Sequence, residues 1–398
     1  MVREFLIKLY LLLFKIQFNF FKLFPLQDKI VFVVSFKDNS LFVYEEMKRR
    51  KIRQKVVFLC ESSSFNVIKN NVDAQVLLFE SKNIIDMVKA IYYLAISKNI
   101  IVDNYFGFLS AVSFKDGVQC TQLWHAAGAI KTFGLKDKSV SLRTKRAKER
   151  FQRVYNQFDK VIVGSDEMAE IFKKAFNLSE NNILYTGIPR TDIFYNQEHQ
   201  EMKRRELFRQ NPQLKDKKII FYVPTFRDDS LDSFDFQLDL DQMCRELSGN
   251  YVVLIKLHPA IKNRPIIEKR LEGFVFDYST YANVNDLLFL TDYLITDYSS
   301  IPYEFSLLEK PMIFYPYDLV EYQEQRGFWG RYEDLVPGPV VYETKDIIEV
   351  IKNNQFDYEK IRDFSRTWNK YSLGRSSENL VNSLFENNMF LNSTEKNA

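Results

Sequence analysis

Short apolar runs recur along the chain, separated by longer segments whose apolar residues have helical spacing. This alternation is typical of βαβ units, whose parallel strands are buried on both faces. In the first half, a helix is expected at 83–97 and strands at 30–35, 56–60, 76–79, 100–103, 119–125 and 161–165. After the polar segment 197–218, strands are expected at 219–224, 251–258, 274–277, 293–297 and 312–315.

The two series predict an α/β fold with two Rossmann-like domains, and a length of 398 residues is more than one core usually supports. We expect an N-terminal helix at 1–28, a first domain at 29–200, a second at 201–374, and a C-terminal helix and tail at 375–398. Ligands of open α/β sheets bind at the carboxyl ends of the strands. The reactive site is therefore expected in a central cleft between the domains.

The first 24 residues are apolar and basic, and their uncharged runs are too short to span a bilayer. Lys8, Lys15 and Lys22 recur at seven-residue spacing, which places them on one stripe of a helix. No small-residue cleavage site follows. The pattern predicts an uncleaved amphipathic helix that lies on a membrane, or alternatively one that packs on its own domain.

The charge and motif content exclude several classes of protein. A net charge of +3 gives no indication of nucleic-acid binding, and Cys60, Cys120 and Cys244 have no metal-binding spacing. Walker, GxGxxG, HExxH and GxSxG motifs are absent from the sequence. The DxD spacing at 239–241 falls in an acidic stretch, 228–241, that we interpret as a solvated loop. No metal site is predicted.

Two of the three histidines follow predicted strands, namely His125 and His258, whereas His199 falls in a charged helical stretch. An imidazole that faces a cleft can remove the proton of an attacking hydroxyl. A histidine that merely holds its loop is an equal alternative for His125.

Groups that suit an anion gather in the second half of the sequence. Residues 296–300 (TDYSS) open a helical run, and a helix N-terminus with nearby hydroxyls can bind phosphate, although ordinary N-capping has the same appearance. Lys256 and His258 end another strand, and Arg326 lies in a loop-like segment. These cations could surround a diphosphate, or could form surface ion pairs.

A basic stretch runs from Lys131 to Arg153, with nine basic and two acidic residues, a balance of nine minus two, or +7. Anionic lipid headgroups are the favoured partner, with a solvated helix face or a nucleic-acid patch as alternatives. Together with the N-terminal lysines, the predicted membrane-surface residues are Lys8, Lys15, Lys22, Arg143, Lys145, Arg146, Lys148 and Arg150.

Nine short motifs, in their expected order, resemble those of the CDP-glycerol glycerophosphotransferase family of wall teichoic acid synthesis. They are Trp124-His-Ala-Ala-Gly128, Thr186-Gly-Ile-Pro-Arg-Thr-Asp192, Tyr222-Val-Pro-Thr-Phe-Arg-Asp228, Lys256-Leu-His-Pro259, Leu294-Ile-Thr-Asp-Tyr-Ser-Ser300, Lys310-Pro-Met-Ile-Phe-Tyr315, Tyr317-Asp-Leu319, Arg326-Gly-Phe328 and Pro337-Gly-Pro339.

The resemblance implies a GT-B-like fold, with the acceptor on the N-terminal domain and CDP-glycerol on the C-terminal domain. It implies that His125 is the general base, that His258 is a second catalytic residue, and that Asp297 positions the donor. The implied donor-binding residues are Thr225, Lys256, Asp297, Ser299, Ser300 and Arg326, with Gly187 and Arg190 nearby. The implied acceptor loop comprises Trp124, Ala126, Ala127 and Gly128.

Within that family the sequence favours a teichoic acid glycerol-phosphate primase. Polymerases typically read Trp-His-Gly-Thr where this chain has Trp124-His-Ala-Ala127, and they commonly carry a long additional N-terminal domain. The implied reaction transfers one glycerol phosphate from CDP-glycerol to the ManNAc of undecaprenyl-diphosphate-linked ManNAc-GlcNAc, with release of CMP. Alternatives are a poly(glycerol phosphate) polymerase, a ribitol-phosphate transferase, a GT-B glycosyltransferase or epimerase, and a non-catalytic membrane adaptor.

The resemblance also implies partners and a location. The expected partners are CDP-glycerol, the lipid-linked disaccharide, an anionic membrane surface and other teichoic acid enzymes, but not nucleic acid. The expected location is peripheral, on the cytoplasmic face of the bacterial cell membrane. No cofactor is required by the sequence, and loosely bound Mg²⁺ is compatible with it.

Overall fold

The computed structural model describes residues 2–81, 83–227, 232 and 234–394. Contacts divide the chain into two units: unit 1 holds residues 1–127, 133–192 and 370–398, and unit 2 holds residues 128–132 and 193–369. Each unit is described by itself. Asp228, which ends one of the family-like motifs and begins the acidic stretch, lies outside the described residues.

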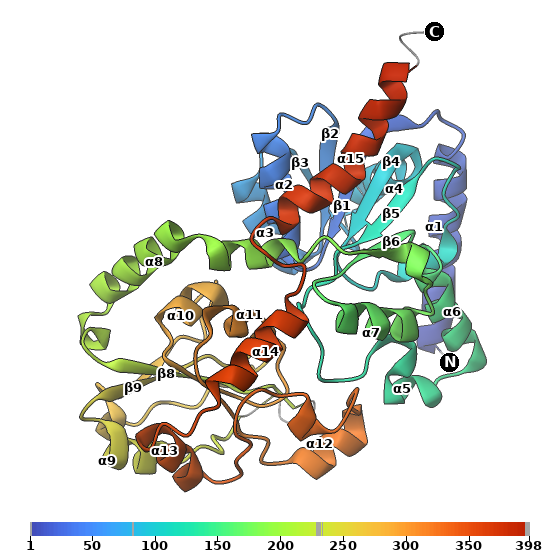
Figure 1. The fold of residues 1–398 in the computed structure, drawn as a ribbon. Coiled ribbons are helices and arrows are strands. Elements are labelled where there is room, and N and C mark those ends of the chain that lie inside the picture. Colours follow the sequence, from blue (N-terminus) through green and yellow to red (C-terminus); the bar gives the residue numbers. More distant parts are fainter. Residues whose placement is uncertain (1, 82, 228–231, 233, 395–398) are drawn as a thin grey trace. The chain divides into compact units, whose positions relative to one another are not determined.

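Unit 1 is built on a seven-stranded sheet with the order β3-β2-β1-β4-β5-β6-β7, in which every paired strand is parallel (Figure 1). The six strands expected in this half are all present, and β7 is a further one. The strands are β1 (Gln27–Val34), β2 (Lys55–Cys60), β3 (Gln75–Leu78), β4 (Ser97–Val102), β5 (Gln119–Gln122), β6 (Lys160–Ile162) and β7 (Ile183–Leu184).

Helices surround this sheet, and the helix expected at 83–97 is confirmed as α4, which the Asn83 side chain caps by accepting from two backbone N–H groups. The helices are α1 (Val2–Phe21), α2 (Lys37–Arg49), α3 (Ser62–Asn71), α4 (Ile84–Ile96), α5 (Lys138–Ser141), α6 (Lys145–Tyr155), α7 (Asp166–Phe176) and α15 (Ser376–Thr394). The chain returns to unit 1 through α15, where Glu378 pairs with Arg50 at 3.2 Å.

Unit 2 contains a five-stranded parallel sheet in the order β10-β9-β8-β11-β12, and each of its strands was expected. The strands are β8 (Lys218–Val223), β9 (Tyr251–Ile255), β10 (Val275–Asp277), β11 (Tyr293–Thr296) and β12 (Met312–Phe314). The helices of this unit are α8 (Gln197–Gln210), α9 (Leu240–Leu247), α10 (Val284–Leu290), α11 (Ile301–Phe305), α12 (Leu319–Arg326), α13 (Thr344–Lys352) and α14 (Tyr358–Trp368).

Several strands are shorter than the apolar runs suggested. β5 ends at Gln122 rather than at residue 125, β6 at Ile162 rather than 165, and β9 at Ile255 rather than 258. Beyond β5, the Trp124 N–H is lost from the ladder because it donates to the Gln122 side chain at 2.8 Å. The chemically interesting residues therefore lie on loops beyond the strands.

Both sheets reverse their strand order in the same way, which creates a switch point in each. In unit 1 the reversal lies between β1 and β4, and in unit 2 between β8 and β11. Asp103 directly follows β4, and Asp297 directly follows β11. Crevices beside such switch points are the usual ligand sites of open α/β sheets.

The N-terminal helix α1 packs on unit 1 by one side only. Phe14 and Phe18 are fully buried, and Phe14 stacks on Phe108 with ring centroids 5.1 Å apart. The opposite side exposes Phe5, Leu6, Leu9, Leu12, Leu13, Ile16 and Phe20. Large apolar side chains thus lie on both sides of α1, so its three lysines do not by themselves define a polar face. In the described part of the chain, no helix is long and apolar enough to span a membrane.

Candidate active site

The loop after β5 presents His125 through a strained turn. Trp124 has a φ of +56°, a conformation that costs a bulky residue about 1–3 kcal/mol and persists only where the surroundings enforce it. Here its N–H donates to Gln122 Oε1, and its carbonyl accepts from Asn39 Nδ2 at 2.9 Å. Such enforced strain is characteristic of functional loops.

The His125 ring is held between two aromatic faces. It stacks on Phe36 with centroids 4.3 Å apart and on Trp124 at 4.4 Å. Its Nδ1 lies 3.3 Å from the carbonyl oxygen of Asp103. A carbonyl can only accept, so Nδ1 carries the proton and Nε2 carries the lone pair. His125 is therefore set up to take a proton through Nε2.

The Asp103 carboxyl fixes the backbone that carries Phe36. It accepts from the N–H of Ser35 at 2.9 Å and from that of Phe36 at 2.8 Å. Burial raises the pKa of Asp103 to about 8, against the opposing effect of these backbone donors. Asp103 thus holds the Phe36 backbone with its side chain and contacts the His125 ring with its carbonyl.

Arg190 and Gly187, predicted near the donor, both lie in unit 1. The Arg190 guanidinium donates to the His125 carbonyl at 3.0 Å, and the backbone N–H of Arg190 donates to Asn39 Oδ1 at 2.9 Å. Gly187 has a φ of +80°, and a Cβ there would lie 2.4 Å from the carbonyl oxygen of Tyr371. Close packing accounts for this glycine, and a donor role for either residue stays a prediction.

In unit 2, His258 has the opposite proton arrangement to His125. Its Nδ1 accepts from the backbone N–H of Ala260 at 3.1 Å, so in the neutral ring Nε2 carries the proton. The ring packs on Phe226 at 4.5 Å. Although His258 reaches solvent, partial burial lowers its pKa, and the cations Lys131 and Lys256 lower it further. His258 is thus set up to donate a hydrogen bond to an anion.

Thr225 and Asp297 meet where β8 and β11 end. The Thr225 N–H donates to Asp297 Oδ1 at 2.8 Å, and the Tyr298 N–H donates to the same oxygen. The Thr225 hydroxyl is buried and finds no hydrogen-bond partner among the described residues. A buried hydroxyl without a protein partner suits a ligand oxygen.

Ser299 and Ser300 are half-buried at the start of α11. Ser299 Oγ accepts from the N–H of Ile301 at 3.1 Å. Because α11 is only five residues long, its dipole is a weak basis for the anion site that we expected at its N-terminus. Hydroxyls and side-chain cations are the better anion ligands in this region.

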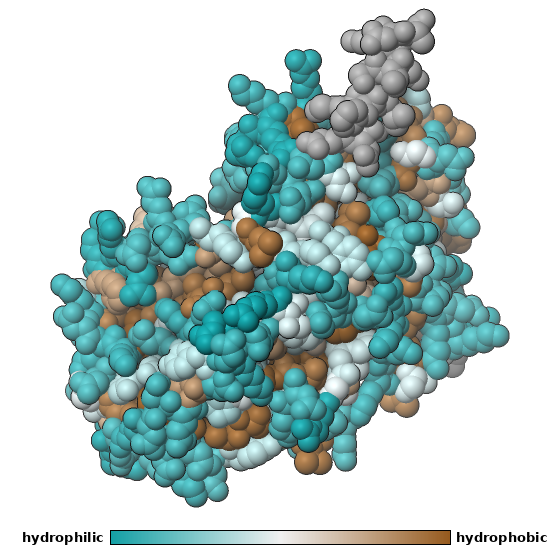
Figure 2. Space-filling view, viewed as in Figure 1, coloured by the Kyte–Doolittle hydropathy of each residue, from teal (hydrophilic) through white to brown (hydrophobic). Residues whose placement is uncertain are grey.

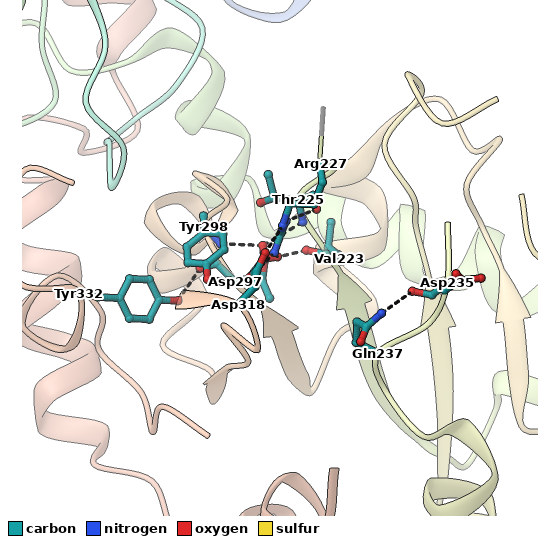
Figure 3. Close-up of polar contacts among 10 residues, drawn as sticks. Val223, Thr225, Arg227, Asp235, Gln237, Asp297, Tyr298, Asp318 and Tyr332 are labelled. Atoms are coloured by element: carbon teal, nitrogen blue, oxygen red, sulfur yellow. Dashed lines mark hydrogen bonds and ion pairs between the residues drawn. The ribbon is translucent and has the colours of Figure 1, made fainter. Parts of the chain in front are cut away.

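Arg227 joins the strand ends of unit 2, although the sequence did not mark it as a site residue (Figure 3). It pairs with Asp297 at 3.1 Å and with Asp318 at 2.6 Å, while Tyr298 also donates to Asp318. Its guanidinium lies 4.7 Å from the Tyr322 ring centroid. Burial opposes its charge, but the hydrogen bond to Asp318 and the Asp297 charge raise the pKa of Arg227.

Other predicted residues lie apart from these groups or have partners of their own. Lys256 donates to the carbonyl of Tyr281, and Lys22 donates to the carbonyl of Ser113. Arg150 pairs with Glu4 of α1 at 3.3 Å. Lys8, Lys15, Arg143, Lys145, Arg146 and Lys148 are exposed.

The acceptor loop is divided between the units: Trp124, Ala126 and Ala127 belong to unit 1, whereas Gly128 belongs to unit 2. Arg326 ends α12 and is half-buried in unit 2. No three His, Cys, Asp or Glu side chains gather as metal ligands in the described ranges. Of the DxD pair, Asp239 caps α9 and Asp241 pairs with Arg270 at 2.7 Å, so neither lies in a solvated loop as we had interpreted them.

Comparison with known proteins identifies the class and then the family. The structure matches that of the wall teichoic acid polymerase TagF with a TM-score of 0.78 at 24% identity, over 98% of this chain and 99% of that one. The match shows the expected GT-B-like α/β fold with parallel sheets.

The sequence comparisons are more specific. A model of the family CDP-Glycerol:Poly(glycerophosphate) glycerophosphotransferase matches residues 16–386. The chain is 39% identical to the teichoic acid glycerol-phosphate primase of Bacillus subtilis (strain 168), over 89% of this chain and 91% of that protein. It is 32% identical to the teichoic acid poly(ribitol-phosphate) polymerase of Bacillus spizizenii (strain ATCC 23059 / NRRL B-14472 / W23), over 96% of this chain and 60% of that protein. The chain belongs to the CDP-glycerol glycerophosphotransferase family and is a transferase enzyme.

Proposed function

We propose that the protein is a teichoic acid glycerol-phosphate primase. It transfers one glycerol phosphate from CDP-glycerol to the ManNAc hydroxyl of undecaprenyl-diphosphate-linked ManNAc-GlcNAc and releases CMP. The observation that carries the proposal is the difference between the Nδ1 partners of the two loop histidines, a carbonyl oxygen for His125 and a backbone N–H for His258. His125 offers a lone pair at Nε2, and His258 offers a proton at Nε2. A phosphoryl transfer to a hydroxyl needs both kinds of group.

In the proposed reaction, the acceptor oxygen attacks the glycerol-bearing phosphorus while His125 Nε2 takes the hydroxyl proton. The bond from that phosphorus to the bridging oxygen breaks, and CMP leaves with the bond electrons. A phosphodiester is formed, and no covalent enzyme intermediate is required. The Nε2–H of His258 and the Thr225 hydroxyl bind donor oxygens, and Asp297 positions Thr225 through its backbone N–H. Lys256, Ser299, Ser300 and Arg326 complete the proposed donor side.

The decisive experiment supplies the purified protein with CDP-glycerol and a synthetic lipid-diphosphate disaccharide. A product heavier by one glycerol phosphate, with an equal amount of CMP, supports the primase. A ladder of products contradicts single addition and indicates a polymerase. Donor binding without an acceptor-dependent product indicates a non-catalytic adaptor, and release of UDP from a UDP-sugar indicates a glycosyltransferase or epimerase.

A ribitol phosphate donor is the second candidate, because the chain is also 31% identical to the teichoic acid ribitol-phosphate primase of Bacillus spizizenii. CDP-ribitol and CDP-glycerol offered together at equal concentration separate the two. We expect glycerol phosphate in the product, and a preference for ribitol phosphate contradicts this part of the proposal. Turnover in the presence of EDTA tests our expectation that no bound metal is required.

We further propose that the protein binds the cytoplasmic face of the membrane through α1. Apolar side chains on one side of α1 are exposed. Helix α1 runs along the right-hand edge of the view in Figure 1, and brown residues lie at its upper end in Figure 2. Exposed apolar residues with flanking lysines are the pattern of an interfacial helix. Ile84 and Ile85 of the adjoining α4 are exposed as well.

Sedimentation with phosphatidylglycerol-containing vesicles tests this location. Leu9→Asp with Leu13→Asp is expected to weaken vesicle binding at least tenfold, since two apolar contacts become charges. Ile266→Asp is the control because Ile266 is also an exposed apolar residue, at 91% against 43% for Leu9 and 50% for Leu13, but lies in unit 2. Equal binding by both variants contradicts membrane binding through α1.

A further inference from the structure

The segment Gly128–Thr132, which we call the strap, begins three residues after His125 but packs in unit 2. It runs antiparallel to the segment after α12, with Lys131 bridged to Phe328. The Thr132 N–H donates to the Gly327 carbonyl at 3.0 Å, and the Trp329 N–H donates to the Ile130 carbonyl at 3.1 Å. The strap is therefore held on both sides of Lys131.

Two further contacts fix the ends of the strap. The Thr132 hydroxyl donates to the carbonyl of Arg326 at 2.7 Å. A Cβ on Gly128 would lie 2.3 Å from the ring of Tyr303, so only glycine permits this approach. Backbone pairing and close packing set the position of Lys131, as they do for residues of a strand.

This position brings Lys131 to the predicted donor groups. Its Nζ lies 6.0 Å from the centroid of Tyr322, a ring whose surroundings also include the Arg326 charge. Partial burial lowers the pKa of His258, and the positive charges of Lys131 and Lys256 lower it further. Lys131, His258 and Arg326 therefore share one region of unit 2.

The charge balance of unit 2 indicates what these cations bind. The diphosphate of CDP-glycerol is an anion, and two carboxylates, Asp297 and Asp318, lie in the same unit. Arg227 pairs with both of them. The positive charge that binds a diphosphate must then come from other residues, and an ammonium group supplies a point charge suited to phosphate oxygens.

We propose that Lys131 is a donor-diphosphate ligand, acting with His258 and Arg326, and not part of a lipid-binding surface. The inference rests on the proposed use of CDP-glycerol. The sequence suggested lipid binding for Lys131, as the first residue of the basic stretch. The other members of that stretch lie in unit 1, whereas Lys131 lies in unit 2.

Calorimetric binding of CDP-glycerol to the full chain tests the inference. Lys131→Met is expected to weaken binding roughly tenfold or more, as for loss of a charged hydrogen bond. Lys131→Arg should keep most of the affinity. Lys136→Met is the matched control: Lys136 is an exposed residue of the same basic stretch but lies in unit 1, and its loss should change donor affinity less than twofold.

Two further measurements separate a ligand from a structural residue. The His258 pKa, followed by NMR, should rise in Lys131→Met because a nearby cation is lost. Binding to phosphatidylglycerol vesicles should be unchanged in Lys131→Met. An unchanged donor affinity, or vesicle binding lost without loss of donor binding, overturns the inference. If Lys131→Met does not fold, Lys131→Gln against Lys131→Arg gives the same comparison.

Different results would refute the proposed donor and the proposed role of Lys131. A wild-type protein that binds no CDP-glycerol refutes the proposed donor. A wild-type protein that binds it with the same affinity as Lys131→Met refutes only the role of Lys131.

Discussion

At the switch point of each unit, an aspartate after one strand accepts hydrogen bonds from the backbone after the neighbouring strand. The two aspartates differ in the charged groups paired with them. In unit 1, Asp103 follows β4 and accepts from the backbone N–H groups beyond β1. In unit 2, Asp297 follows β11 and accepts from the N–H beyond β8. Each carboxyl clamps two neighbouring strand ends, and only Asp297 has an arginine, Arg227, paired with it in the contacts described above.

This difference in charge compensation matches the roles proposed for the histidine of each unit, His125 and His258. In the proposed reaction Nε2 of His125 must be unprotonated, and a carboxyl with a raised pKa, such as that of Asp103, adds little negative charge beside it. Asp297 lies beside groups suited to an anion, where an uncompensated carboxylate would repel the ligand. In the proposed mechanism, the clamp without a paired arginine lies in the unit of the base, and the clamp paired with Arg227 lies in the unit of the donor anion.

The largest effect is expected from the same substitution made at each of the two histidines. Asparagine offers an N–H donor but no base. His125→Asn should lower turnover roughly 10²–10⁴-fold, the usual worth of a general base, with donor affinity unchanged. His258→Asn should retain much more turnover because its amide N–H can replace the Nε2–H. Equal losses in a CMP-release assay would contradict the division of roles.

Removal of the arginine from unit 2 should give the next largest effect. Arg227→Met leaves the buried Asp297 and the half-buried Asp318 without their cation. We expect a loss of about 3–5 kcal/mol in the free energy of unfolding, measured by urea denaturation. Adding Asp297→Asn to this variant should recover part of the loss, because one carboxylate is removed. No recovery in the double variant would show that Arg227 acts through packing on its tyrosines.

The corresponding change in unit 1 should cost less and should depend on pH. Asp103→Asn places an amide N–H against backbone donors, a loss of about 1–3 kcal/mol in the free energy of unfolding at pH 5. Because the folded pKa of Asp103 is raised from 3.8 to about 8, its stabilising contribution is complete below pH 4 and is lost as the pH rises through 8. The gap between wild type and Asp103→Asn should therefore narrow from pH 5 to pH 8. A constant gap would contradict the raised pKa.

The smallest predicted effect is the pH dependence of donor binding. The pKa of His258 is lowered in the free protein, and a bound diphosphate should raise it again by its negative charge. Binding then takes up a proton, so CDP-glycerol affinity should strengthen a few-fold as the pH falls from 7.5 to 5.5. Calorimetry in two buffers with different ionisation enthalpies measures the uptake. His258→Asn should abolish it, and uptake that persists in this variant would assign the proton to another group.

The apolar runs predicted every described strand except β7, because parallel strands buried on both faces give continuous apolar segments. The sequence also placed both histidines and Asp297 at strand ends, where such folds bind ligands. Arg227 was visible within the motif that begins at Tyr222, but its importance was not, because an arginine beside strand ends has no distinctive local pattern. Asp103 ended a predicted strand without any sign that it would clamp the neighbouring one.

The His125 tautomer and the place of Lys131 depend on contacts between distant segments, whereas the His258 tautomer depends on a contact within its own loop. A histidine tautomer is set by the partner of Nδ1, and these partners are a carbonyl 22 residues away for His125 and a backbone N–H two residues away for His258. Lys131 reads in the sequence as the first of nine basic residues, yet pairing with a segment almost 200 residues later places it in unit 2. The periodicity of the sequence indicates which side chains are buried. Contacts between distant segments determine which charged groups lie close together.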